Sequence, residues 1–318
     1  MESQTGIRVA LATLLAPISW GTTYVAITEL LPADRPLFVA LMRTVPAGLL
    51  LVGVGWWRSQ WLPDRSQWRR LVVLAMCNFG AFFPLLIVAI YRLPGGVAAS
   101  VGGIQPLLVG VITWIVVGRA MRGLDVAVGL VAAFGVAMVV IRPGASIDSV
   151  GLLAALGANV SFSAGVVATK RLPSFPDQIV STGFQMLIAA VALAPISLLA
   201  EGPPPTISPV NALGFAYLSV IATGAAFVIW FTGISRLPTQ APPVLGLAAP
   251  CTGAALGWLL LGEDLTAIQV LGFATTIGAI GYAATIGSMR SGRQPRLGRS
   301  VLARPKRSSA LPAHHPTR

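Results

Sequence analysis

One ionisable side chain, Arg43, lies well inside a long apolar stretch of the sequence. A charge in such surroundings is costly, and it usually faces a water-filled cavity or a polar partner. Two roles are open for it. The guanidinium can attract a carboxylate or another acceptor on a bound small molecule, or it can pair with Glu29 and with exposed backbone carbonyls. Both roles require neighbouring segments to bring a partner to Arg43.

Aromatic side chains form a second candidate group. Trp20 and Tyr24 are one helical turn apart and share a face of a helix. Trp20 falls in the middle of an apolar segment, so a position in an interfacial aromatic belt does not explain it. Together with Phe162, these rings can line a pocket on which a ligand stacks, or they can serve only as interior packing.

Three amides, Asn78, Gln105 and Gln185, also lie in apolar segments. Hydrocarbon offers them no partner, so each must bind another helix, water or a ligand. Gln105 is the strongest candidate because Pro106 follows it, and a proline inside a helix leaves a carbonyl without its hydrogen bond. Pro250 has the same effect in the second half. Paired broken helices indicate a transport site, although each can also be a simple kink.

The elements that carry these residues follow from the spacing of charges. Hydrophobic residues make up 55% of the 318 residues and charged residues only 10%, which excludes an ordinary soluble protein. A spanning helix needs roughly 20 apolar residues. The sequence therefore predicts an all-α integral membrane protein with ten transmembrane helices. The ten segments cover 9–28, 36–57, 71–91, 93–118, 126–141, 149–169, 178–200, 202–235, 237–262 and 265–289.

The distribution of basic residues predicts the orientation. Lys and Arg accumulate on the cytoplasmic side of membrane proteins. With the N-terminus inside, the predicted outer loops contain only Arg35, Arg92 and Arg142 of the 22 Lys and Arg residues, and Arg43 is intramembrane. Both termini are therefore expected in the cytoplasm of a cell whose plasma (inner) membrane holds the chain. The basic segment 289–318 is expected to be a disordered tail against anionic lipids, so the net charge of +12 does not indicate a nucleic-acid partner.

The two halves of the chain correspond at a nearly constant offset. Arg43 corresponds to Gln185 at an offset of 142 residues, and Trp20 to Phe162 at the same offset. Pro106 corresponds to Pro250 at 144. We therefore expect a first repeat over 1–143, a second over 144–288, and the tail. Five helices in each half is an odd number, so the second repeat must be inverted, as in secondary transporters.

Four groups of residues form a recognisable pattern: Ser19-Trp20-Gly21-Thr22-Thr23-Tyr24, Pro36 with Arg43, Ala98 with Gln105-Pro106, and Leu261-Gly262-Glu263-Asp264-Leu265 with Gln269 and Gly272. With these motifs the sequence resembles the EamA-type transporters of the drug/metabolite transporter superfamily, over about residues 8–288. The first-half counterpart of the last motif, Val117-Gly118-Arg119-Ala120, lacks its acidic pair. The resemblance implies ten helices in two five-helix repeats and the export of small metabolites or drugs.

Catalytic machinery is not apparent in the sequence. The only histidines, His314 and His315, lie in the tail, and the ten carboxylates lie at predicted helix ends or in loops. Cys77 and Cys251 are far apart, so the sequence indicates neither a metal site nor a disulfide framework. No Gly-Lys-Ser/Thr phosphate loop is present. We expect no enzyme activity, no cofactor and no ATP-driven pumping by this chain.

The sequence thus favours a secondary transporter that exports small organic solutes, amino-acid-like or drug-like, by alternating access. An uptake permease and a non-transporting membrane scaffold are the alternatives. Expected partners are a small-molecule substrate and membrane lipids, while monomer and homodimer both remain open. A central cavity is expected between the first, third, fourth, sixth, eighth and ninth segments. Its expected substrate-binding residues are Trp20, Tyr24, Arg43, Asn78, Gln105, Phe162 and Gln185, with Pro106 and Pro250 as helix breaks for gating.

Overall fold

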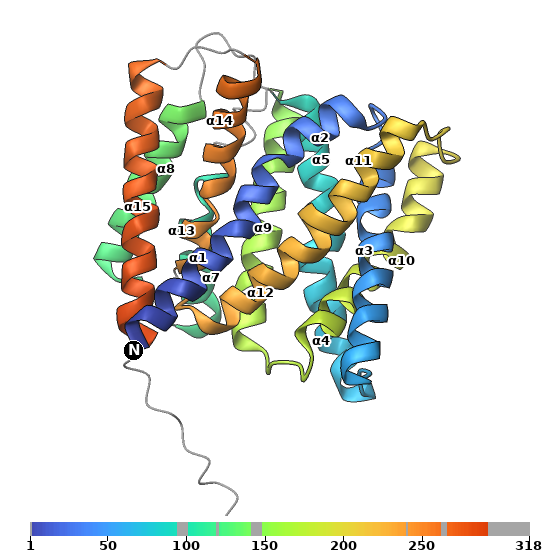
Figure 1. Cartoon of the computed structure of the whole chain (residues 1–318), viewed down its shortest axis with the longest axis horizontal. Coiled ribbons are helices and arrows are strands. Elements are labelled where there is room, and N and C mark those ends of the chain that lie inside the picture. Colours follow the sequence, from blue (N-terminus) through green and yellow to red (C-terminus); the bar gives the residue numbers. More distant parts are fainter. Residues whose placement is uncertain are drawn as a thin grey trace, which may run out of the picture.

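The computed structural model describes residues 2–93, 101–118, 121–140, 148–239, 241–261 and 266–291. Within these ranges every regular element is a helix, which confirms the predicted all-α class (Figure 1). The pair Glu263-Asp264, the dipeptide Arg119-Ala120 and the tail beyond Ser291 lie outside the described residues. The helices are α1 (Glu2–Gly21), α2 (Thr23–Leu30), α3 (Pro36–Ser59), α4 (Arg65–Ala75), η1 (Met76–Gly80), α5 (Phe82–Arg92), α7 (Gln105–Val117), α8 (Gly123–Val140), α9 (Ser149–Arg171), α10 (Gln178–Glu201), α11 (Pro209–Ser219), η2 (Val220–Ala225), α12 (Ala226–Arg236), α13 (Ala241–Leu245), α14 (Ala248–Leu261) and α15 (Ala267–Ser291).

Among the described residues, six helical stretches are long and apolar enough to cross a membrane. The other predicted segments overlap with α7, α8, α13 with α14, and α15. The six stretches are Gly6–Leu30, Pro36–Ser59, Arg65–Arg92, Ser149–Arg171, Gln178–Glu201 and Pro209–Arg236.

The outer surface of the bundle is apolar. Leu199 is 89% exposed and Val191 is 76% exposed, both on α10. Exposed leucine, valine and isoleucine side chains also lie along α1, α7 and α15. Such a surface is unfavourable in water but matches the hydrocarbon of a bilayer. The chain is a multi-pass membrane protein.

Helices α3 and α10 run antiparallel with their ends matched. At the end of α10, the Glu201 carboxylate accepts hydrogen bonds from the backbone N–H groups of Leu37 (2.6 Å) and Phe38 (2.8 Å), in the first turn of α3. At the other end, Nη2 of Arg58, in the last turn of α3, lies 3.9 Å from Oδ2 of Asp177, which caps α10. Each carboxylate thus satisfies the free N–H groups at a helix start.

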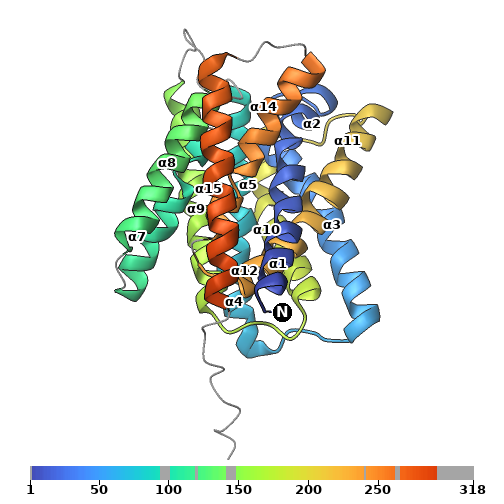
Figure 2. The same cartoon turned by 60° about the vertical axis from the view of Figure 1, so that its left-hand side comes forward.

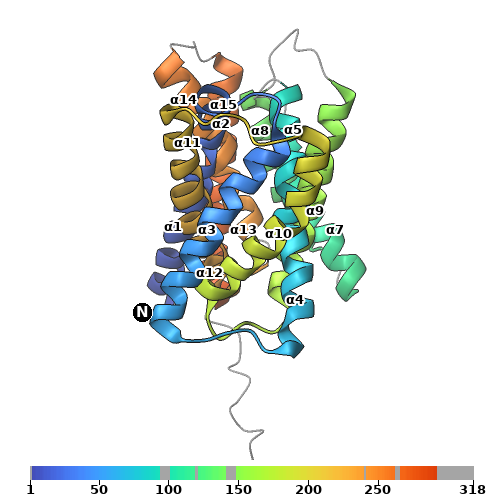
Figure 3. The ribbon, with the colours of Figure 1, turned by 90° about the vertical axis from the view of Figure 1, so that its right-hand side faces the viewer.

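Most helix pairs that pack closely join the first half of the chain to the second. Besides α3 with α10, they include α8 with α15, α5 with α9, and α1 with α12, α14 and α15 (Figures 2 and 3). Small residues permit the approach: a Cβ built on Gly183 of α10 would stand 2.9 Å from the carbonyl oxygen of Gly48 on α3. Close backbone contact through glycine is how membrane helices gain packing energy.

Several helices are interrupted at corresponding places in the two halves. The π-helical turns η1 and η2 separate α4 from α5 and α11 from α12. Turns at residues 103–104 and 246–247 precede α7 and α14. From the sequence, Pro106 and Pro250 were predicted to lie in helix interiors, and this prediction was wrong. Both lie in the first turn of a new helix, because proline disfavours helical geometry before it but costs little at a helix start.

Candidate functional site

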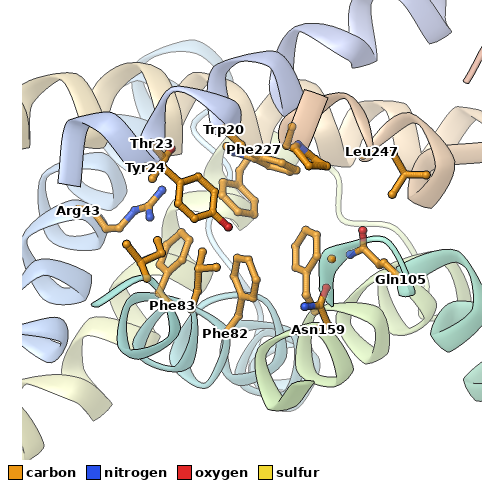
Figure 4. Close-up of a pocket in the computed structure, with 17 residues that line it drawn as sticks. Trp20, Thr23, Tyr24, Arg43, Phe82, Phe83, Gln105, Asn159, Phe227 and Leu247 are labelled. Atoms are coloured by element: carbon orange, nitrogen blue, oxygen red, sulfur yellow. The ribbon is translucent and has the colours of Figure 1, made fainter. Parts of the chain in front are cut away.

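A cavity of about 120 Å³ lies inside the bundle (Figure 4). It is lined by the six segments between which the sequence predicted a cavity, and α3 adds Arg43. Its volume is sufficient for several water molecules or part of a small organic solute. The lining residues are Trp20, Thr23, Tyr24, Arg43, Phe82, Phe83, Leu86, Ile90, Gly102, Gln105, Asn159, Phe162, Phe227, Gly246, Leu247, Ala249 and Pro250.

Arg43 forms the charged end of this cavity. Its side chain is 1% exposed, Nε donates a hydrogen bond to Thr223 Oγ1 (3.0 Å), and the guanidinium carbon lies 3.9 Å from the ring centre of Phe83. In the described part of the chain, Nη1 has no hydrogen-bond partner. The possible ion pair with Glu29 is not formed: within the described ranges, the ion pairs join Arg58 to Asp177 and Arg92 to Asp148.

Thr23 and Tyr24 lie beside Arg43 because α1 ends at Gly21 and α2 begins at Thr23. Thr23 is 4% exposed, and its Oγ1 has no partner among the described residues. The hydroxyl of Tyr24 points into the space between Trp20 and Phe82 (Figure 4). The break between α1 and α2 therefore places Thr23 beside the guanidinium and directs the Tyr24 hydroxyl further along the cavity.

Aromatic rings form the walls. The ring centres of Trp20 and Phe162 are 5.9 Å apart in an edge-on arrangement, and those of Phe82 and Phe162 are 4.6 Å apart and stacked. The ring centres of Trp20 and Phe227 are 4.9 Å apart. The predicted pair of Trp20 and Phe162 is therefore present, but the rings pack on each other as well as facing the cavity. Phe227 could have been identified from the sequence, since it corresponds to Phe83 at an offset of 144 residues.

The two interrupted helices meet at the other end of the cavity. A Cβ built on Gly246, just before α14, would stand 3.2 Å from Gln105 Oε1, at the start of α7. Asn159 of α9 lies beside Gln105 (Figure 4). Asn159 was not predicted as a site residue, although it is an amide in an apolar segment three residues before Phe162. Pro250 lines the cavity, whereas Pro106 does not.

Asn78 and Gln185 do not line the cavity. Asn78 Nδ2 donates to Gln185 Oε1 (3.2 Å), and both side chains are buried. A Cβ built on Gly165 of α9 would stand 2.8 Å from Asn78 Cγ, so α9 covers this pair closely. Hydrogen bonds between amide side chains on different helices are one way in which membrane helices are held together.

Each π-helical turn is held by two polar side chains from the other half of the chain. Arg43 binds Thr223 of η2, and Trp20 Nε1 donates to the carbonyl of Ala222, also in η2 (3.1 Å). In η1, Asn78 binds Gln185, and Ser161 Oγ donates to the carbonyl of Cys77 (2.8 Å). Arg43 and Gln185 are equivalent positions of the repeat, so the two arrangements correspond. A π-helical turn frees backbone carbonyls and often marks a functional site.

Comparisons with known proteins match this chain twice to one family model. The model of the EamA-like transporter family matches residues 7–141 and again residues 149–285. Protein PecM of Dickeya dadantii is 33% identical over 259 residues, which is 81% of this chain and 86% of PecM.

Two further matches extend the comparison. A probable amino-acid metabolite efflux pump of Escherichia coli is 25% identical over 285 residues, covering 81% of this chain and 89% of the pump. A solved crystal structure superposes with a TM-score of 0.72 at 22% identity, covering 89% of this chain and 98% of that one. At this identity the superposition shows a shared fold alone.

Proposed function

The chain belongs to the EamA-like transporter family, and on this premise we propose that it is an inner-membrane secondary transporter that exports small organic metabolites by alternating access. The observation that carries the proposal is the cavity, because it lies where the two interrupted helices meet. Buried sites between broken helices of two repeats are the usual position of substrate in secondary transporters.

The proposed architecture is ten transmembrane helices in two inverted five-helix repeats, over 1–143 and 144–288. Three observations support it. The equivalent helices α3 and α10 run antiparallel, as inversion requires. The turns η1 and η2 lie at equivalent positions. The packing of α5 on α9 has its counterpart in the packing of α12 on α1.

The cavity residues have distinct proposed roles. Trp20, Tyr24 and Phe162 provide the surface on which cargo stacks, and Gln105 orients it. Arg43 supplies electrostatic attraction. Pro106 and Pro250 set the positions of the helix breaks, about which the two repeats rock.

Asn78 and Gln185 have a different proposed role from the one their sequence positions suggested. Their mutual hydrogen bond holds η1 against α10, so they fix the geometry of the cavity from outside it.

The names of the relatives support the export of small metabolites, since several are described as efflux pumps or exporters. The distribution of Lys and Arg supports cytoplasmic termini.

Counterflow in proteoliposomes tests this proposal. The purified full chain is reconstituted with a mixture of amino acids and small amphiphilic metabolites inside, and exchange with labelled external solutes is followed by mass spectrometry. We expect exchange by the wild type and little by Trp20→Ala. The matched control is Trp57→Ala, because Trp57 is 87% exposed on the outer surface.

Three results would contradict parts of the proposal. Equal exchange by wild type and Trp20→Ala would remove Trp20 from the site. Accumulation of solute in energised cells that express the protein would identify an uptake permease instead of an exporter. A folded wild-type protein that moves no solute in the mixture would favour the scaffold alternative.

A further inference from the structure

The cavity wall carries a buried positive charge without a negative partner. Arg43 is 1% exposed, and no carboxylate lies within 4.0 Å of it in the described ranges. The described lining residues include no Asp or Glu, so the net charge of the lining is +1. A buried charge without a counter-ion is strongly unfavourable, and a bound solute can supply the missing negative group.

Two unsatisfied donors lie together at this end. Arg43 Nη1 and Thr23 Oγ1 are both buried without a hydrogen-bond partner among the described residues. Figure 4 shows Thr23 and the Arg43 guanidinium side by side, both at the edge of the cavity. The Arg43 Nε is already bound to Thr223, which fixes the direction of the remaining N–H groups. A guanidinium with an adjacent hydroxyl suits the two oxygens of a carboxylate.

The rest of the cavity suits a flat apolar body. The rings of Tyr24, Phe82 and Phe227 lie between the Arg43 end and the opposite end, where the amides of Gln105 and Asn159 lie (Figure 4). Aromatic rings bind other flat groups by stacking and by edge contacts. The amides can orient a hydrogen-bonding substituent on the far side of the solute.

Resting on the proposed function, we propose that the cavity takes a small aryl or arylalkyl carboxylic acid without an ammonium group. Its carboxylate binds Arg43 and Thr23, and its ring lies between the aromatic walls. A zwitterionic amino acid fits less well, because its ammonium lies next to its own carboxylate and would stand beside the guanidinium. Like charges that close together repel, and no carboxylate among the described lining residues offsets them.

Four probes with the same phenyl ring test this preference. Phenylacetate, phenylacetamide, phenylalanine and phenylethylamine are titrated at pH 7.4 into the purified full chain in detergent, and binding is measured by calorimetry. We expect phenylacetate to bind about tenfold more tightly than the amide or the amino acid, since it alone gains a charge-assisted hydrogen bond without repulsion. The amine should bind most weakly.

Two variants assign the preference to the proposed residues. Arg43→Gln should abolish the preference for the acid over the amide, whereas Arg92→Gln, at an exposed surface position, should retain it. Thr23→Val serves if Arg43→Gln does not fold, because it removes a hydroxyl that binds no described residue. It should weaken phenylacetate binding several-fold and leave the melting temperature unchanged.

The proposal is overturned if the amide or phenylalanine binds the wild type as tightly as phenylacetate, or if no probe binds. It is also overturned if phenylacetate affinity is unchanged in Thr23→Val, or if folded Arg43→Gln keeps the preference. Counterflow of the metabolite mixture distinguishes a failure of the proposed substrate class from a failure of the proposed transport function. Flux without an acid preference contradicts the substrate class alone, whereas the absence of any flux contradicts transport itself.

Discussion

At the scale of single residues, Thr223 and Thr23 are the same residue type in opposite situations. Thr223 accepts the hydrogen bond from Arg43 Nε, whereas Thr23 Oγ1 is buried with no partner among the described residues. Thr223→Val should therefore lower the free energy of unfolding by about 1–3 kcal/mol, because it leaves a charged donor unpaired. Thr23→Val removes an unsatisfied group and should cost nothing. Denaturant unfolding in detergent, followed by tryptophan fluorescence, measures both.

A loss of stability in Thr23→Val equal to that in Thr223→Val would contradict this distinction. It would mean that the Thr23 hydroxyl makes a structural hydrogen bond. Threonine and valine have nearly the same shape, so packing changes little in either variant. The comparison therefore isolates the effect of removing the hydroxyl group.

The sequence predicted where Arg43 lies in the membrane but not what it binds. A lone charge in an apolar segment is visible without a structure, and so are the amides Asn78, Gln105 and Gln185. Their partners are not visible, because Thr223 is 180 residues away from Arg43 in the chain. Glu29 was the partner considered from the sequence, yet it does not pair with Arg43. Which polar group meets which depends on how the two halves pack.

At the scale of elements, the close approach of α1 to α14 depends on Gly21. A Cβ built on Gly21 would stand 2.5 Å from Thr252 Cβ and 2.6 Å from the carbonyl oxygen of Ala249. Gly21→Ala should therefore destabilise the protein by about 1–3 kcal/mol through overpacking. Gly53→Ala is the control, because a Cβ at Gly53 would have no atom of the described residues within 4 Å. Equal unfolding midpoints for the two variants in a detergent denaturation series would contradict the observed contact.

The cap of α10 should make stability depend on pH. Burial by itself raises the pKa of the Asp177 carboxyl, but hydrogen bonds from Val180 N–H, the Ser59 hydroxyl and Ile179 N–H, together with Arg58, lower it below its usual value. A lowered pKa in the folded state stabilises the protein above the unfolded pKa near 3.8, and this contribution is lost as the pH falls through the folded pKa.

Asp177→Ala should consequently lower the free energy of unfolding by about 1 kcal/mol at pH 7. The difference from wild type should shrink as the pH falls below about 4. Asp177→Asn is the control, since asparagine also caps helices and should retain most of the stability at pH 7. Thermal unfolding from pH 3 to 7 measures these differences. A difference between wild type and Asp177→Ala that grows at low pH would contradict the role of the carboxylate.

Helix interruptions were only partly predictable. The prolines indicated breaks near residues 106 and 250, but sterics place each break before its proline, at the turns 103–104 and 246–247. The π-helical turns were not predicted, because Met76–Gly80 and Val220–Ala225 lie inside long uncharged segments that were each expected to form one continuous helix. Their geometry is stabilised by side chains of the other half, such as Trp20 and Ser161, and no local sequence pattern contains that information.

At the scale of the whole molecule, the spacing of charges predicted the all-helical membrane class, and six of the predicted segments coincide with helical stretches long enough to cross a membrane. This works because hydrocarbon excludes charges and requires backbone groups to bond within a segment. The cavity could be predicted only in outline. The segments that surround it were predicted from the sequence, and so were five of its lining residues: Trp20, Tyr24, Arg43, Gln105 and Phe162. Phe82 and Asn159 emerged only from the packing of α5 on α9.

The most direct test of transport through this cavity is to fill it. Leu86 lines the cavity from α5, and Leu199 is 89% exposed on the outer surface of α10. Counterflow of the metabolite mixture is measured in proteoliposomes for Leu86→Trp and for Leu199→Trp, with folding verified by thermal unfolding. We predict that Leu86→Trp reduces exchange to the level of empty liposomes and that Leu199→Trp exchanges like wild type. Exchange by folded Leu86→Trp at the wild-type rate would show that solute does not pass through this cavity.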